Sequence, residues 1–312
     1  MAKKSKEKRL STMRKREAYK VFLLALPAIV YIFVFNYVPL WGWVYAFFNY
    51  KPGRDLEDCA YVGLKNFTAM FSNPVMFRNA MNSIKNTFGI KFLSYLFTPL
   101  PMLFAIFLSE LRSKKYQKLI QTVCTLPHFV SWVIVYSLFV SIFASDGLLN
   151  NVLFELGWID KSVNYLASSN HVWIKQVLIN EWKSLGWSSV VYFAAIAGID
   201  QSLYEAASMD GATRMQRIWN ITIPQLIPTF FVLLIMSIGK FLNTGVEQYM
   251  VFSNPMNKVH LETLDLYVYN LGIGNGQISY SVAVGTMTSL VAIVMFASAN
   301  WFSKKVREES LF

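Results

Sequence analysis

The 312-residue sequence predicts an all-α polytopic membrane protein with about six transmembrane helices. Only 15% of its residues are charged, whereas soluble domains carry about 25%. Hydrophobic residues make up 54% of the chain, and they gather in stretches near the ~20 residues that cross a hydrocarbon core. Too few polar groups remain to cover the surface of a soluble domain.

Hydropathy predicts six spans, beginning with 21–48. This first stretch exceeds the about 7–15 apolar residues of a cleavable signal peptide and has no small-residue cleavage site, so we interpret it as a retained helix. Pro39 predicts a break near its end, where Trp41 and Trp43 gather as aromatic residues do at a membrane interface. The six predicted spans are 21–48, 83–109, 119–143, 173–198, 225–246 and 281–303.

The distribution of positive charge predicts that both termini are cytoplasmic. Nine of the 29 Lys and Arg residues lie in the tail 1–20, directly before the first span. With that tail inside, the inside segments hold 18 Lys and Arg, whereas the longer outside segments hold 6. A nucleic-acid-binding domain would instead carry its basic residues on one face among other polar residues, so we expect no nucleic-acid partner.

The cytoplasmic loop 199–224, between the fourth and fifth spans, has the pattern of a helix-turn-helix. Good helix formers surround Ala206 and Ala207. Gly211 then interrupts the helix, as glycine does where a helix ends. A second apolar segment leads to Pro224, which suits the first turn of the next helix. We expect this loop to lie across the cytoplasmic face and to fit a groove on another protein.

The same loop resembles the signature of the integral-membrane subunits of binding-protein-dependent ABC importers. That signature is Glu-Ala-Ala, three residues, Gly, nine residues, Ile, one residue and Leu-Pro. Ile223 replaces the leucine, and the matching positions are Glu205, Ala206, Ala207, Gly211, Ile221 and Pro224. In that family the loop docks into a cleft of the ATPase subunit. The resemblance assigns the docking contact to Glu205, Ala206, Ala207, Asp210, Gly211 and Arg214, against the alternative of a connector without a docking role.

The resemblance covers nearly the whole chain, and the chain is most similar to the oligosaccharide and polysaccharide branch of the family. It implies the type I importer transmembrane fold, with an extra N-terminal helix at 21–48 before a core domain at 83–303 and a cytoplasmic tail at 304–312. Four further stretches carry this likeness: Leu126-Pro127-His128-Phe129-Val130-Ser131-Trp132, Trp182-Lys183-Ser184-Leu185-Gly186-Trp187, Leu203-Tyr204 and Gly276-Gln277-Ile278-Ser279-Tyr280. A non-sugar solute remains the alternative substrate.

The resemblance also implies the partners and the location. They are a second permease subunit, expected to be a different chain, two ATPase subunits, an extracytoplasmic solute-binding protein, a carbohydrate substrate and membrane lipid. The sequence shows no phosphate-binding loop, so ATP and Mg²⁺ are expected on the ATPase subunits, with no cofactor in this chain. The expected location is the bacterial cytoplasmic membrane, with a multi-pass topology.

A sugar path needs hydrogen-bonding groups and aromatic faces around a water-filled space. In the resembled family, the helices that flank the docking loop line this path. The candidate lining residues are Asn180, Trp182, Trp187, Asn243, Glu247 and Gln248. The alternative places the tryptophans in the interfacial aromatic belt and gives Glu181 and Lys183 an ordinary interfacial position.

The sequence offers little for a catalytic or metal site, and we expect neither. His128 lies in the third predicted span, whereas His171 and His260 lie in predicted outside loops and cannot easily reach it. A metal site needs three or four convergent ligands. An intramembrane enzyme would need paired acidic residues or a nucleophile with its base at membrane depth. A secondary transporter acting alone would typically show duplicated halves, and no internal repeat is evident. These two classes remain the less favoured alternatives.

Overall fold

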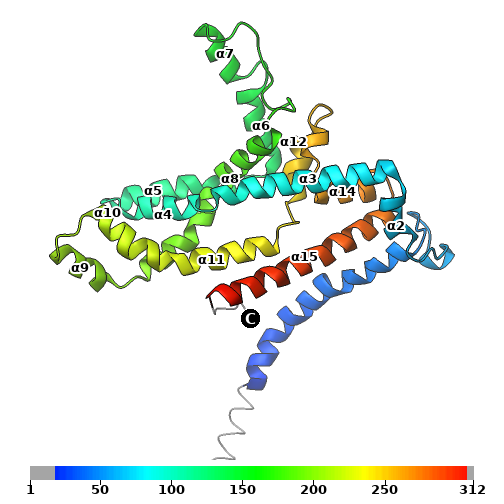
Figure 1. The fold of residues 1–312 in the computed structure, drawn as a ribbon, viewed down its shortest axis with the longest axis horizontal. Coiled ribbons are helices and arrows are strands. Elements are labelled where there is room, and N and C mark those ends of the chain that lie inside the picture. The colour runs from blue at the N-terminus through cyan, green and yellow to red at the C-terminus, as the bar shows by residue number, and fades with distance from the viewer. Residues whose placement is uncertain (1–17, 308–312) are drawn as a thin grey trace, which may run out of the picture.

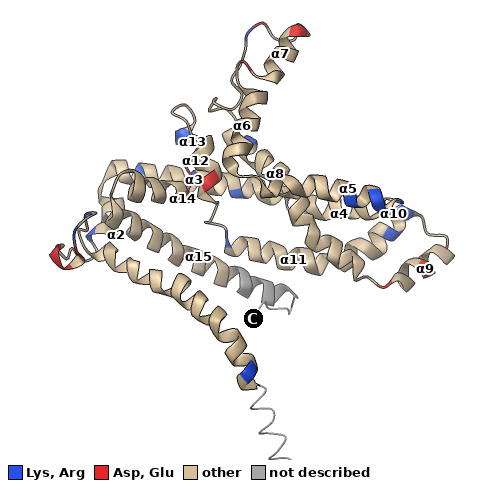
Figure 2. Cartoon of the chain, turned by 180° about the vertical axis from the view of Figure 1, so that it is seen from behind, with Lys and Arg blue, Asp and Glu red and all other residues tan. Residues whose placement is uncertain are grey.

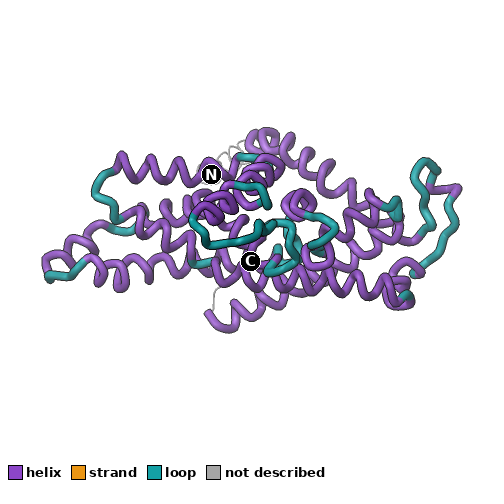
Figure 3. Tube along the Cα trace, turned by 90° about the horizontal axis from the view of Figure 1, so that it is seen from above, coloured by secondary structure: helices purple, strands orange, loops and turns teal. Residues whose placement is uncertain are grey.

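The computed structural model describes residues 18–307, so most of the predicted basic tail 1–20 and part of the predicted tail 304–312 lie outside the described residues. Helices joined by loops make up this part of the chain (Figure 3), with one isolated antiparallel bridge between Phe48 and Tyr61. After the first helical turns from Ala18, the elements are η1 Phe33–Tyr37, η2 Val38–Phe47, η3 Leu56–Asp58, α2 Lys65–Ser72, α3 Pro74–Phe97, α4 Leu100–Ser109, α5 Lys114–Thr125, η4 Leu126–Phe129, α6 Trp132–Phe143, α7 Leu148–Glu155, α8 Val172–Ala197, α9 Gln201–Met209, α10 Arg214–Arg217, η5 Ile218–Thr222, α11 Ile223–Gly239, α12 Val246–Phe252, α13 Lys258–Leu261, α14 Leu264–Tyr269, η6 Asn270–Gly274 and α15 Ile278–Arg307.

Five helices of the described residues are long and apolar enough to cross a membrane: Ala18–Phe47, Pro74–Ser109, Trp132–Glu155, Arg214–Gly239 and Ile278–Ser298. The predicted span 173–198 coincides with α8 to within one residue at each end. The helix α8 is long enough to cross a membrane but is not among those five apolar helices, and it carries Lys175, Glu181 and Lys183. Several polar side chains of α8 are buried, including Gln176, Lys183 and Ser189. The prediction of an all-α multi-span fold is confirmed.

The first span runs along Ala18–Phe47, close to the predicted 21–48. Pro39 does not end this helix. The backbone instead tightens to a 3-10 helix from Val38 and leaves helical geometry at Phe48, where ψ is 158°. The segment projects away from the other helices (blue in Figure 1), and only its C-terminal part, η2, packs against α15 and α2. None of its most apolar window is buried within the chain.

The predicted third span, 119–143, is wrong as a single helix. It divides into α5 and α6 around a segment that we call the α5–α6 break, Leu126–Ser131, which consists of the 3-10 turn η4 and two extended residues. Pro127 has no N–H and cannot continue the hydrogen-bond ladder of α5. Val130 is extended with ψ 135°, and the Ser131 hydroxyl accepts a hydrogen bond from the N–H of Ile134 to start α6. Beyond the break, α6 and α7 project away from α5 and α8 (Figure 1).

Two other spans begin earlier than predicted. The second starts at Pro74, where the Asn73 side chain accepts hydrogen bonds from two backbone N–H groups and so caps the helix. The fifth is continuous from Arg214 to Gly239, so it begins inside the predicted docking loop and ends seven residues before the predicted end. Asn243 therefore lies in the linker between α11 and α12, and Glu247 lies on α12.

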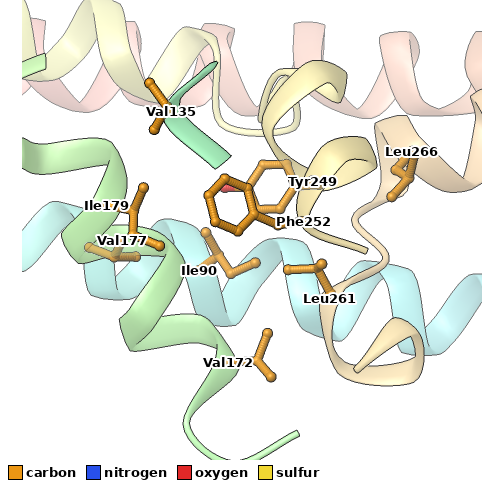
Figure 4. Close-up of a cluster of buried hydrophobic side chains, with 9 residues drawn as sticks. All are labelled: Ile90, Val135, Val172, Val177, Ile179, Tyr249, Phe252, Leu261 and Leu266. Carbon is orange, nitrogen blue, oxygen red and sulfur yellow. The ribbon is translucent and has the colours of Figure 1, made fainter. Parts of the chain in front are cut away.

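The largest buried cluster joins α8 to helices on both sides of it in the sequence. Its members come from α3, α6, α8, α12, α13 and α14: Ile90, Val135, Val172, Val177, Ile179, Tyr249, Phe252, Leu261 and Leu266 (Figure 4). A separate cluster around Leu226 joins α11 to α4 and α8. Because α8 packs against α3, α4, α5 and α11, it is the central helix of the bundle and leads directly toward α9.

Candidate functional site

The candidate docking segment is α9 together with its closing turn. Asp200 begins it as the N-cap and accepts a hydrogen bond from the N–H of Ser202 (2.9 Å). At the other end, the N–H of Ala212 donates to the carbonyl of Ala207 (2.9 Å) and the N–H of Gly211 donates to the carbonyl of Ser208 (3.2 Å). This pair of bonds is the Schellman arrangement, and it needs a left-handed residue, which Gly211 provides with φ +77°.

The second half of the loop, after Gly211, is already helical. Thr213 and Gln216 form a reciprocal capping box that starts α10. From there the helix runs without interruption to Gly239, through a wider π-helical turn at η5. Two side-chain bonds tie α9 to this helix: Arg217 donates to the Ser208 hydroxyl (2.9 Å), and the Tyr204 and Thr222 hydroxyls lie 2.9 Å apart. The predicted helix-turn-helix is therefore present.

The docking segment is strongly exposed and lies at one end of the long axis of the bundle (Figure 1). Of the predicted contact residues, Ala207 is half-buried, and the others are exposed: Glu205, Ala206, Asp210, Gly211 and Arg214. Met209, Met215 and Trp219 add large apolar side chains to this end, with exposed fractions of 88%, 57% and 62%. Exposed aromatic and methionine side chains are enriched where proteins contact each other. The resemblance points to six small or charged residues and does not include these three.

A polar cavity of about 410 Å³ separates the docking segment from the bundle. Its walls come from α4, α5 and α8 on one side and from α9, α10 and η5 on the other. The lining residues are Ser109, Glu110, Lys114, Gln117, Gln121, Phe193, Ile196, Ala197, Gln201, Tyr204, Arg217 and Thr222. Since the protein leaves this space beneath α9, the segment is held mainly at its two ends and by its two side-chain bonds.

The N-cap of α9 gives a first testable expectation. The backbone N–H of Ser202, followed by its hydroxyl, holds the pKa of the Asp200 carboxyl below its ordinary value of 3.8. A depressed pKa means that the ionised cap stabilises α9 above that ordinary value and is lost as the pH falls through the lower, folded-state pKa. We expect Asp200→Ala to speed hydrogen exchange of the α9 amides at neutral pH.

Asp200→Asn is the matched control, because it keeps the side-chain acceptor and should retain the exchange rate of the native chain. Exchange measured by mass spectrometry between pH 6 and 8 should show no added pH effect from the cap. Equal exchange in the Ala and Asn variants would contradict the capping role.

The candidate path residues fall on two adjoining elements. Asn180, Trp182 and Trp187 lie on α8, and the two tryptophans are 43% and 49% exposed. Trp187 stacks on the His128 ring of the α5–α6 break, with centroids 4.7 Å apart and planes 3° apart. Trp182 meets Phe139 of α6 edge to face at 5.4 Å. Each tryptophan thus contacts the interrupted third span and keeps part of its surface exposed.

The other path candidates lie around α12. Gln248 is only 3% exposed, and its amide donates to the backbone carbonyl and the side-chain oxygen of Gln176, both at 2.9 Å. These bonds fix α12 against α8. Glu247 and Asn243 are exposed, and the backbone carbonyl of Asn243 accepts a hydrogen bond from Lys91 (2.8 Å). Five of the six candidates thus have accessible or half-buried side chains, and the Gln248 amide is occupied within the protein.

Within residues 18–307, no group of three or more His, Cys, Asp and Glu side chains is placed to hold a metal ion. His128 is occupied by its stacking on Trp187 and lies against Phe129. His171 and His260, by contrast, line a separate cavity of about 370 Å³ with Trp173.

Comparison with known proteins gives a consistent set of relatives. The chain is 38% identical over 99% of its length to the polygalacturonan/rhamnogalacturonan transport system permease protein YteP of Bacillus subtilis (strain 168), of which the match covers 95%. It is also 38% identical to protein LplB of the same organism, over 94% of this chain and 91% of that protein.

A solved structure has the same fold. A chain in the crystal structure of a bacterial ABC transporter involved in the import of the acidic polysaccharide alginate superposes with a TM-score of 0.81. Their sequences are 34% identical, and the match covers 96% of this chain and 99% of that one. Residues 98–308 match the family described as the binding-protein-dependent transport system inner membrane component. This chain therefore belongs to that family of membrane transport permeases.

Proposed function

We propose that this chain is a permease subunit of an ATP-driven importer and forms part of the path of an oligosaccharide. The observation that carries the proposal is the connection of the exposed α9 to the elements with the path candidates. A three-residue connection joins α9 to α8, a helix of 26 residues that carries Asn180, Trp182 and Trp187. At about 1.5 Å per residue, α8 is tens of ångströms long. It can therefore transmit a movement of α9 to the residues along its length.

The proposal includes partners for this chain. Two ATPase subunits would bind ATP and Mg²⁺ and press on α9 of this chain and on the matching segment of a second permease subunit, which we expect to be a different chain. An extracytoplasmic binding protein would deliver the sugar. The names of the relatives support a carbohydrate, and one similar solved structure holds an alginate pentasaccharide-bound periplasmic protein with the alginate transporter. Differential binding of ATP to the two states would then drive alternating access.

The proposed orientation puts α9 and both termini in the cytoplasm of a bacterial cell. Lys and Arg residues gather on α5 and α10, beside α9 (Figure 2). The cations at this end are Arg112, Lys114, Lys115, Lys118, Arg214 and Arg217. An excess of Lys and Arg marks the cytoplasmic side of membrane proteins, which supports this orientation.

A reconstitution experiment tests the proposal. Proteoliposomes that contain this chain, its second permease and its ATPases should take up a labelled oligosaccharide only with ATP and the loaded binding protein present. The matched control contains an ATPase variant that binds ATP without hydrolysing it, and uptake should stop. Uptake by this chain alone, without ATPase subunits, would contradict the proposal.

The path assignment gives a second testable expectation. Asn243→Ala and Glu247→Ala should lower sugar uptake and leave the thermal midpoint of the chain nearly unchanged, because both side chains are exposed. Gln248→Ala serves as the contrast. This change removes the hydrogen-bond partner of the buried Gln176 and should destabilise the chain by about 1–3 kcal/mol. Unchanged uptake in both exposed-residue variants would remove Asn243 and Glu247 from the path.

A further inference from the structure

Lys183 lies where a charged side chain is costly, on the central helix of a membrane bundle. Only 7% of its surface is exposed. Its ammonium donates a hydrogen bond of 2.7 Å to the backbone carbonyl of His128 and lies 5.1 Å from the centre of the Trp132 ring. His128 lies in the 3-10 turn within the α5–α6 break, and Trp132 is the first residue of α6. A single cation of α8 therefore bridges the end of one half-helix and the start of the next.

The break needs such a partner. The 3-10 turn ends at Phe129 and Val130 is extended, so no following helical turn donates to the carbonyl of His128. A backbone group without a partner at membrane depth costs several kcal/mol, and irregular backbone is tolerated there only inside protein or beside water. The C-terminal end of a helix also carries partial negative charge, which favours a cation. Lys183 meets both requirements.

Further contacts hold the α5–α6 break close to α8. A Cβ at Gly186 would lie 2.2 Å from the backbone carbonyl oxygen of Cys124, so the two helix backbones touch where only glycine fits. One residue further, Trp187 stacks on His128 and meets Phe129 edge to face at 5.7 Å. These contacts hold the α5–α6 break against the central helix α8.

We propose that Lys183 is a positioning residue for transport, which fixes the α5–α6 break to α8 so that displacement of α9 moves α6 and α7. This inference rests on the proposed function only in that α9 receives the displacement. Without the ammonium, the half-helices would remain but the angle between α6 and α8 would no longer be defined. Lys175, two turns earlier on α8, provides a matched contrast because it donates to the carbonyls of Tyr165 and Ser168 in the preceding loop.

A distance measurement on the full chain tests the positioning role without any transport activity. Spin labels would be placed at Ser137→Cys of α6 and Val191→Cys of α8, two exposed positions, with Cys59 and Cys124 replaced by serine. We expect one narrow distance distribution with Lys183 and with Lys183→Arg, and a broad one with Lys183→Met. Lys175→Met should remain narrow. A narrow distribution for Lys183→Met would overturn the proposal.

A second variant covers the case in which Lys183→Met does not fold. Trp132→Leu removes the ring beside the ammonium, and it should also broaden the distribution. A distribution as narrow as that of the native chain would overturn the proposal. In the reconstituted complex, Lys183→Met should reduce stimulation of ATP hydrolysis by the loaded binding protein by about 5- to 150-fold, the usual range of coupling between sites. Lys183→Arg should restore it.

The two arms separate the two proposals. If the native complex shows no stimulation at all, the proposed function fails, and the distance measurement still decides the role of Lys183. If the native complex is stimulated and Lys183→Met is stimulated equally, the function stands and the positioning role is overturned.

Discussion

Gly186→Ala is expected to destabilise this chain more than any other single-methyl change, by about 3 kcal/mol or more, at the upper end of overpacking costs. The added Cβ would lie 2.2 Å from the backbone oxygen of Cys124 and 2.5 Å from the backbone nitrogen of Thr125. Backbone atoms cannot move aside as a flexible side chain can. Relief therefore requires α5 and α8 to separate, which would also strain the hydrogen bond of Lys183 at the α5–α6 break. Thermal unfolding of the purified chain in detergent measures the effect.

Gly285→Ala on α15 is the matched control. A Cβ there would meet only the Val268 side chain, at an ordinary 3.6 Å, so its thermal midpoint should remain close to that of the native chain. If both variants unfold at the native temperature, the close approach of α5 to α8 is absent, and the account of the break is contradicted.

Substitution of Gly211 is expected to weaken the proposed docking of an ATPase subunit in a graded order. Its φ of +77° is left-handed, and a Cβ there would have nothing within 4 Å, so any effect arises from backbone conformation alone. Left-handed geometry costs most residues about 1–2 kcal/mol, and asparagine tolerates it better. We therefore expect recovery of the ATPase with the purified permease to fall in the order Gly211, Gly211→Asn, Gly211→Ala and Gly211→Val.

The bundle itself should not respond to this series, because the docking segment contributes no residue to the buried clusters. The thermal midpoint of the isolated chain is the control and should stay nearly constant across the four proteins. Equal recovery of the ATPase with Gly211→Val and with the native chain would contradict a docking role that depends on this turn.

Much of the fold could be predicted from hydropathy and charge. The first span and α8 fall within a few residues of the predicted bounds, since the lengths of apolar stretches follow the thickness of the membrane. The turn at Gly211 was also predictable, because a glycine after a run of helix formers marks a helix end. These features depend on local sequence, which a single chain reveals.

The interruption of the third span was not predicted, although Pro127 stands in the middle of it. Proline inside a span can kink a helix or end it, and tertiary contacts decide between these outcomes. Here the contacts at the break come from Lys183 and Gly186, more than fifty residues away in the sequence. A charged residue within a predicted span was the available signal, but its partner is a backbone carbonyl that no side-chain pattern reveals.

The site was predicted unevenly for the same reason. The docking residues follow from a contiguous motif, whereas the exposed Met215 and Trp219 fall between its fixed positions. The path candidates were chosen by their helices, and side-chain direction was not predictable. Gln248 is therefore buried against Gln176 and Trp187 is half exposed. Their roles in a sugar path stay predictions until uptake is measured.

Cross-linking of the exposed tip of α9 tests the central claim most directly. Met209 is 88% exposed at the end of α9, and Trp158, 73% exposed in the loop after α7, is a comparably accessible control. In native membranes that contain the full transporter, a bifunctional reagent on Met209→Cys should link this chain to an ATPase subunit, whereas Trp158→Cys should not. A link to the ATPase from Trp158→Cys, with none from Met209→Cys, would place the motor elsewhere and contradict the account.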